Sequence, residues 1–131
     1  MVTALITGAN RGIGLETSRQ LAARGATVIA ASRRLAPHPH GDPLMLDVTD
    51  GRSIRAAATV VAERYGTIDV LVNNAAIYLP CPLVETTLEE WDRTMAVNLR
   101  AAFVLLKAAL PVIAAGGGGS VLQISSNLAE R

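Results

Sequence analysis

The feature that most constrains the fold of this chain lies in its first fourteen residues, where an apolar run precedes three closely spaced glycines and a helical pattern. Residues 2–7 have the composition of a buried strand, and Gly8, Gly12 and Gly14 mark the turn that follows it. Glycines at such a junction permit a sharp turn, the close approach of a phosphate and tight packing of helix on strand. The helix N-terminus then presents N–H groups and a positive dipole end to an anion. This arrangement predicts a nucleotide-binding strand–turn–helix unit.

The spacing of these glycines narrows the class of nucleotide site. A phosphate-binding loop of the G-x-x-x-x-G-K-[ST] type needs a lysine after its last glycine, and Leu15 stands there instead. The pattern G-x-x-x-G-x-G also differs from the more common dinucleotide fingerprint G-x-G-x-x-G. Taken alone, the glycines are equally compatible with a turn that binds no ligand. Residues further along the chain are needed to distinguish a nucleotide site from such a turn.

Four motifs in order resemble segments of the short-chain dehydrogenase/reductase family. Residues 7–14, T-G-A-N-R-G-I-G, resemble its T-G-x-x-x-G-x-G signature, and Asn73-Asn74-Ala75-Ala76 resembles its N-N-A-G with alanine in the last place. Residues 97–99 and 124–126 resemble two further segments. The resemblance extends over the whole chain, but over only about the first half of a typical member.

Alternating strand and helix patterns predict an α/β fold, a Rossmann-type doubly wound parallel sheet with strand order 3-2-1-4-5 that stops after strand five. A length of 131 residues corresponds to one domain, and we expect residues 1–131 to form an NAD(P)-binding domain that is incomplete at its C-terminus. The expected strands are residues 2–7, 27–31, 44–46, 68–72 and 121–125.

Helical spacing predicts two helices that each bury one face. The first face is made of Ile13, Thr17, Leu21 and Ala22, and the second of Ile54, Ala58, Val61 and Tyr65. A capping box at residues 87–90 predicts the start of a helix that runs past Asn98, and residues 101–115 predict a buried helix.

The resemblance implies a nicotinamide dinucleotide at the carboxyl ends of the strands. Its diphosphate is expected at the glycine turn, and its adenine beside Asp47 and Val48, with the Asp47 carboxylate accepting from the exocyclic amine. Asparagine amides can bond both to neighbouring strands and to the cofactor, so we expect Asn73 and Asn74 to do both. The remaining expected contacts are Thr7, Gly8, Asn10, Arg11, Gly12, Ile13, Gly14 and Ala75.

The end of the second expected strand indicates which dinucleotide is bound. In NAD-binding folds, an acidic residue about 20 residues past the glycines holds the ribose 2′-hydroxyl. Here Ser32 occupies that place, and Arg33 and Arg34 follow it. Guanidinium groups match phosphate oxygens with planar, charged donors. The sequence therefore favours NADP(H) over NAD(H), the alternative being two solvated arginines at a strand end.

The implied chemistry is reversible hydride transfer between the nicotinamide and a small-molecule carbonyl or alcohol. The resemblance implies that Ser126 hydrogen-bonds the substrate oxygen and that Asn98 binds a water in a proton relay. The general acid/base of the family is a tyrosine followed four residues later by a lysine. Lys107 is the only lysine in the chain, and neither Tyr65 nor Tyr78 is paired with it in this way. We therefore expect the N-terminal part of an enzyme, inactive by itself.

Composition argues against several other classes of protein. A net charge of +1 gives no electrostatic footprint for nucleic acid, and the single cysteine, Cys81, excludes an internal disulfide. His38 and His40 lie in a proline-rich stretch expected to be a solvated loop beside the adenosine pocket, so we expect no metal site. With no signal sequence and an apolar run of residues 101–115 too short to span a bilayer, we expect a cytoplasmic protein without a membrane partner. The apolar character of this run on more than one side favours a homodimer or homotetramer of the full-length form.

Two other functions stay open at this point. A non-catalytic nucleotide-binding module, or an inactive fragment, would keep the glycine turn without turnover, and the missing tyrosine–lysine pair favours it for this chain. A SAM-dependent methyltransferase also has a glycine-rich first turn, but it does not account for Arg33, Asn73-Asn74 and residues 124–126 together.

Overall fold

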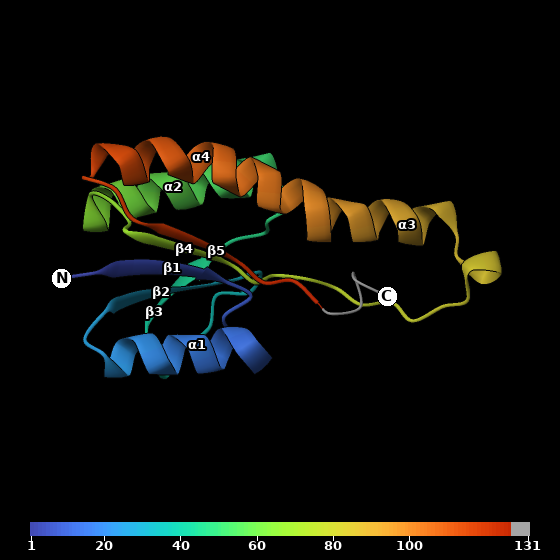
Figure 1. Ribbon diagram of the computed structural model, residues 1–131, viewed down its shortest axis with the longest axis horizontal. Coiled ribbons are helices and arrows are strands. Elements are labelled where there is room, and N and C mark those ends of the chain that lie inside the picture. The colour runs from blue at the N-terminus through green and yellow to red at the C-terminus, as the bar shows by residue number, and fades with distance from the viewer. Residues whose placement is uncertain (127–131) are drawn as a thin grey trace.

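The computed structural model describes residues 1–126, which form a central sheet with helices on both faces (Figure 1). The strands pair in the order β3-β2-β1-β4-β5 and every neighbouring pair is parallel, which confirms the predicted fold class and strand order. Helix α1 covers one face of the sheet, and α2 and α4 cover the other (Figure 1). The bounds are β1 Thr3–Thr7, α1 Gly12–Ala23, β2 Thr27–Ser32, β3 Asp42–Met45, α2 Gly51–Tyr65, β4 Val70–Asn73, η1 Leu83–Glu85, α3 Leu88–Met95, η2 Ala96–Arg100, α4 Ala101–Ala115 and β5 Ser120–Gln123.

Strand boundaries differ from expectation by up to two residues, in the interior strand β4, which begins at Val70 instead of residue 68, as well as at the two edges of the sheet. Strand β3 begins at Asp42 and contains Pro43, which was expected to lie in a loop. Proline has no N–H to donate and is tolerated here because β3 is an edge strand. Strand β5 ends at Gln123, which pairs with Asn73, the last residue of β4. The two strands therefore end at the same level, with one further hydrogen bond from the Ile124 N–H to the Asn73 carbonyl at 3.0 Å.

The buried faces of the first two helices agree in part with the predicted ones, because Leu21 and Ala22 of α1 and Ile54, Val61 and Tyr65 of α2 contact the core as expected. On α2, Ala57 lies in the core with Val61, which follows it by four residues on the same helix face, whereas Ala58 is exposed. On α1, the buried residues are Gly14 and Ser18, and the Ser18 hydroxyl donates to the Gly14 carbonyl at 2.8 Å. Ile13 is 61% exposed and lines a groove instead. A hydrogen-bonded serine in the core gives no apolar signal in the sequence.

A continuous helix of 28 residues, Leu88–Ala115, combines α3, the π-helical turn η2 and α4. Its start is the predicted capping box, in which the Glu90 N–H donates to Thr87 Oγ1 at 3.1 Å and the Thr87 N–H donates to Glu90 Oε2 at 2.8 Å. By length and composition alone this helix could cross a membrane, unlike the shorter apolar run of residues 101–115. Core helices of soluble proteins pass the same test when they are mostly buried; here Leu105 and Ile113 of α4 lie in the core, but only 17% of the apolar 18-residue window is buried.

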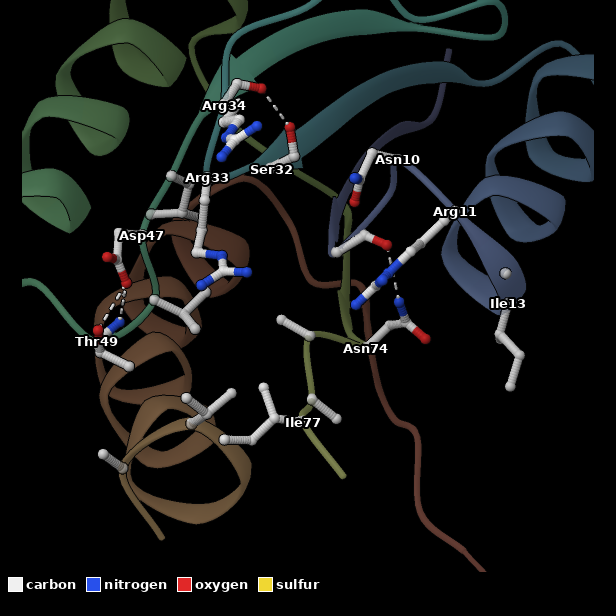
Figure 2. Close-up of a pocket in the computed structure, with 18 of the residues that line it drawn as sticks. Asn10, Arg11, Ile13, Ser32, Arg33, Arg34, Asp47, Thr49, Asn74 and Ile77 are labelled. Carbon is white, nitrogen blue, oxygen red and sulfur yellow. Dashed lines mark hydrogen bonds between the residues drawn. The ribbon is translucent and has the colours of Figure 1, made fainter. Parts of the chain in front are cut away.

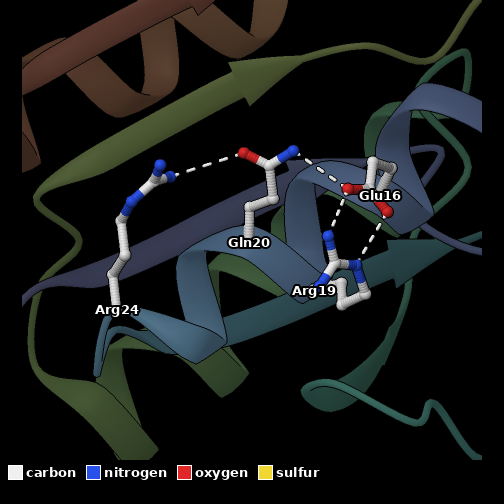
Figure 3. A network of polar contacts seen from close by, with 4 residues as sticks. All are labelled: Glu16, Arg19, Gln20 and Arg24. Carbon is white, nitrogen blue, oxygen red and sulfur yellow. Dashed lines mark hydrogen bonds and ion pairs between the residues drawn. The ribbon is translucent and has the colours of Figure 1, made fainter.

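A chain of polar contacts runs along the exposed side of α1 (Figure 3). The Glu16 carboxylate accepts from Arg19 Nε at 2.8 Å, Arg19 Nη2 at 2.6 Å and Gln20 Nε2 at 2.9 Å. These hydrogen bonds, with the one from Arg19 the largest cause, lower the pKa of Glu16 from 4.5 to about 2. The pair is solvent-exposed, so its contribution to stability is small.

Acid titration of this contact gives a first prediction. Because the folded-state pKa of Glu16 lies below its ordinary value of 4.5, the stabilisation is present above that pH and is lost as the pH falls toward 2. Urea unfolding followed by circular dichroism should show a steeper loss of unfolding free energy over this window in the wild type than in Glu16→Gln. Glu63→Gln, at an exposed α2 position, is the matched control and should keep the wild-type slope. Equal slopes for all three proteins would contradict the assignment.

Candidate functional site

A groove of about 890 Å³ lies at the carboxyl ends of the strands (Figure 2). It is bounded by the turn after β1, the ends of β2 and β3, the segment after β4 and the helix formed by α3 and η2. In open α/β sheets, ligands bind at this edge, where successive helices change from one face to the other. Most of the predicted cofactor residues line the groove, namely Gly8, Asn10, Arg11, Gly12, Ile13, Ser32, Arg33, Asp47, Val48, Asn74 and Ala75.

Three predicted cofactor residues, Thr7, Gly14 and Asn73, do not line the groove. Thr7 is buried, and its hydroxyl oxygen accepts the N–H groups of Asn74 and Ala75, each at 3.0 Å. It therefore holds the segment after β4 against β1. Asn73 is also buried, and neither polar atom of its side-chain amide has a hydrogen-bond partner among residues 1–126.

The three glycines of the turn have different steric surroundings. Gly8 and Gly12 adopt φ values of 62° and 54°, a conformation that favours glycine. A Cβ on Gly14 would lie 2.3 Å from the Gly8 carbonyl oxygen, so close packing requires glycine there. A Cβ on Gly12 would meet nothing within 4 Å, so the space above this residue is open toward the groove.

Gly14→Ala gives a second prediction, because the added methyl group would contact backbone that cannot move without displacing the turn. Such overpacking costs about 1–3 kcal/mol of unfolding free energy. Gly51→Ala is the matched control, since its Cβ would meet only the flexible end of Arg55 at 3.5 Å. Denaturant titration should show a loss for Gly14→Ala only. A Gly14→Ala protein as stable as Gly51→Ala would show that the turn relaxes freely.

Asn74 combines a structural role with a position in the groove. Its side-chain amide donates to the carbonyl oxygens of Thr7 at 3.0 Å and Gly8 at 3.2 Å. Figure 2 shows it beside Arg11 at the edge of the groove. These bonds hold the start of the glycine turn, so this predicted residue supports the shape of the site directly.

At the far end of the groove, the Asp47 carboxylate lies together with the side chains of Arg33 and Arg34. Asp47 Oδ1 accepts from the Thr49 N–H at 2.9 Å and from the Thr49 hydroxyl at 2.7 Å. These hydrogen bonds, with a further contribution from the charge of Arg33, lower the pKa of the Asp47 carboxyl group. The Arg33 side chain extends into the groove from the end of β2 (Figure 2). The Ser32 hydroxyl donates to the Arg34 carbonyl at 2.7 Å and thereby shapes this strand end.

The two predicted catalytic residues lie outside the lining of the groove. Asn98 belongs to the π-helical turn, and its amide donates to the Ile77 carbonyl at 2.8 Å while accepting the Ile77 N–H at 2.9 Å. This pair of bonds connects η2 to the segment after β4. Ser126 follows β5 at the same edge of the sheet.

Several residues of the groove were not predicted from sequence. Some are neighbours of predicted residues, but one wall comes from the distant helix, whose contributing residues have the spacing i, i+3, i+4 and so share one helix face. This helical spacing is the sequence signal from which that wall of the groove could have been predicted. The loop of residues 35–41, expected beside the adenosine, does not line the groove. The additional lining residues are Arg34, Leu46, Thr49, Ala76, Ile77, Arg93, Ala96 and Val97.

A parallel sheet in this order, with a glycine turn and a groove at its carboxyl edge, defines a Rossmann-type nucleotide-binding fold. The family model described as short chain dehydrogenase matches residues 2–131, and the chain belongs to this family, as its motifs predicted. Members of the family use nicotinamide cofactors.

Individual proteins of known sequence or structure are also similar to this chain. The chain is 38% identical to sorbitol dehydrogenase of Cereibacter sphaeroides, over 98% of this chain and 54% of that protein. It is 38% identical to L-xylulose reductase of Homo sapiens, over 97% of this chain and 54% of that protein. A putative short-chain dehydrogenase/reductase from Burkholderia xenovorans has a similar structure, with a TM-score of 0.91, 32% identity and coverage of 99% of this chain and 58% of that one. The chain thus spans about half the length of the curated relatives it matches.

Proposed function

We propose that this chain is the cofactor-binding part of an NADP(H)-dependent oxidoreductase that transfers hydride between the nicotinamide and a small carbonyl or alcohol. The observation that carries the proposal is the charge of the groove. Among residues 1–126, Arg11, Arg33, Arg34 and Arg93 line it together with one carboxylate, that of Asp47. Within residues 1–126, none of these arginines forms a salt bridge. Their charge is therefore available to an anionic ligand.

The residues present fit a dinucleotide. Helix α1 has no side-chain hydrogen bond at its N-cap, Arg11, and no acidic residue in its first turn, so its first N–H groups are available to a diphosphate. The open space above Gly12 leaves room for it. In this proposal Asp47 and Val48 hold the adenine, and Arg33 holds the 2′-phosphate. Asn74 and Ala75 contact the ribose at the end of β4.

The nicotinamide would supply or accept the hydride. In the proposed enzyme, Ser126 hydrogen-bonds the substrate oxygen and Asn98 supports the proton relay. Relatives named for sorbitol, galactitol and D-threitol favour a polyhydroxylated alcohol, or the matching carbonyl compound, as substrate. The 131 residues contain no Tyr-x-x-x-Lys pair, so we propose that they bind cofactor without turnover by themselves. We place the protein in the cytoplasm, without nucleic-acid or membrane partners.

Isothermal titration calorimetry with NADPH and NADH tests this function. We expect saturable binding of both, with NADPH bound at least about tenfold more tightly because one additional charge-assisted contact is made. Equal affinities would show that the 2′-phosphate is not recognised. Binding of neither nucleotide would overturn the proposed function.

The outer face of the long helix supports the proposal of a homo-oligomer. Phe103 and Leu110 of α4 are 64% and 51% exposed, whereas Leu105 packs on the sheet. Exposed apolar patches of this kind are typical of protein interfaces. Sedimentation velocity should show self-association of the wild type and a monomer for Phe103→Glu. Ala58→Glu, at an exposed position on α2, should remain associated. A monomeric wild type would contradict the proposal.

A further inference from the structure

A single histidine links the glycine turn to the loop between β2 and β3. His38 Nε2 lies 3.0 Å from the Ala9 carbonyl oxygen, and the His40 backbone N–H donates to His38 Nδ1 at 3.2 Å. A carbonyl oxygen can only accept and a backbone N–H can only donate. Both contacts are therefore made together only by the neutral imidazole that carries its proton on Nε2.

The bond to Ala9 acts on the part of the turn that lines the groove. Ala9 is fully buried, and its N–H donates to the Ala31 carbonyl of β2 at 3.1 Å. With His38 on its carbonyl, both backbone polar groups of Ala9 are bonded. The Ala9 carbonyl and the Asn10 N–H belong to one planar trans peptide, so the direction of the carbonyl sets that of the N–H. Asn10, Arg11 and Gly12, which follow, line the groove.

The loop is also fixed at both of its ends. At its start, the Ser32 hydroxyl donates to the Arg34 carbonyl, across Arg33. At its end, Gly41 lies so close to β2 that a Cβ there would be 2.6 Å from the Val28 carbonyl oxygen. Between these two points, the His38 side chain hydrogen-bonds the loop to the glycine turn. The loop that follows the arginines is thus joined to the turn that would bind the diphosphate.

We propose that His38 is a positioning residue for dinucleotide binding. It does not line the groove, and it acts by holding the glycine turn and the Arg33–Arg34 strand end in one fixed arrangement. The expected effect of His38 on nucleotide affinity rests on the proposed function. The tautomer and the hydrogen bonds of His38 can be tested on the protein without nucleotide. A positioning role should affect NADPH and NADH alike, because both carry the diphosphate.

Calorimetry of matched variants tests the role. We expect His38→Ala to weaken the binding of both nucleotides by about 3-fold and at most about 10-fold, because the bond to Ala9 holds the turn in its binding arrangement before the nucleotide arrives and its full worth limits the effect. His38→Gln can still donate to the Ala9 carbonyl and should retain most of the affinity. His38→Asn keeps an acceptor for the His40 N–H but does not reach Ala9, and should behave like His38→Ala. His40→Phe is the control, because it keeps both the backbone N–H that donates to His38 Nδ1 and an aromatic ring for the edge contact with the His38 ring, 6.2 Å between ring centroids; it should bind as the wild type does.

The outcomes separate this role from the proposed function. Wild-type affinity in His38→Ala and His38→Asn would overturn the role while leaving the function intact, and a loss confined to NADPH would show a charge effect instead of positioning. If His38→Ala does not fold, the comparison of His38→Gln with His38→Asn decides. Absence of binding by the wild type would overturn the proposed function and, with it, this role. Long-range ¹H–¹⁵N NMR of the nucleotide-free protein should show the Nε2–H tautomer of His38, and the Nδ1–H tautomer would contradict the geometry.

Discussion

Replacing Arg33 with alanine is expected to weaken NADPH binding by about 10- to 150-fold, corresponding to the loss of a charge-assisted hydrogen bond worth about 1.5–3 kcal/mol. Arg33 extends into the groove from the end of β2, and no salt bridge within residues 1–126 neutralises it. NADH lacks the 2′-phosphate, so its affinity should change far less. The measurement is calorimetric titration of both nucleotides at one fixed ionic strength, because salt screens such contacts.

Arg24→Ala is the matched control for this substitution. It removes the same charge from the exposed end of α1, where the guanidinium group contacts Gln20 outside the groove. It should leave both affinities near the wild-type values, which separates a local contact from a change in net charge. Equal losses of NADPH and NADH affinity in Arg33→Ala would show that the arginine supports the fold of the groove and does not recognise the phosphate.

The second large effect concerns catalysis. The 131-residue chain, assayed with NADPH and a panel of ketones, aldehydes and ketoses, is expected to show no turnover above that of an Asn98→Ala, Ser126→Ala double variant. A positioned general acid/base contributes about 10²–10⁴-fold to such reactions. Lys107, the only lysine, is preceded four residues earlier by Phe103 in place of tyrosine. Loss of the acid/base would leave the cofactor bound but the carbonyl oxygen without a proton donor.

We expect neither tyrosine of the chain to act as the general acid/base. The Tyr65 hydroxyl donates to Asp42 at 2.7 Å, and burial together with this hydrogen bond raises its pKa above the ordinary value of 10.0. A phenol of raised pKa is a poor acid/base near neutral pH. Tyr78 is 77% exposed and does not line the groove. Turnover clearly above that of the double variant would contradict the prediction and show that a group other than a tyrosine–lysine pair supplies the proton.

Local sequence patterns predicted the features that depend on neighbouring residues. The glycine turn, the apolar strands, the capping box at Thr87 and Glu90 and the arginine at the end of β2 each require only a short segment with suitable propensities. Short connections and right-handed crossovers then leave few possible strand orders, which is why the order of the sheet could be predicted as well.

Only the tertiary structure determined which residues from distant parts of the chain contact one another. Thr7 belongs to the glycine motif in sequence, but strand register turns it onto the segment after β4 and away from the groove. The Asn98 amide is bonded to Ile77 because η2 passes over that segment, and Arg93 reaches the groove from a helix distant in sequence. His38, expected to be a solvated loop residue, bonds to Ala9. These contacts join residues far apart along the chain, and their partners are set by sheet register and helix packing, which no local pattern encodes.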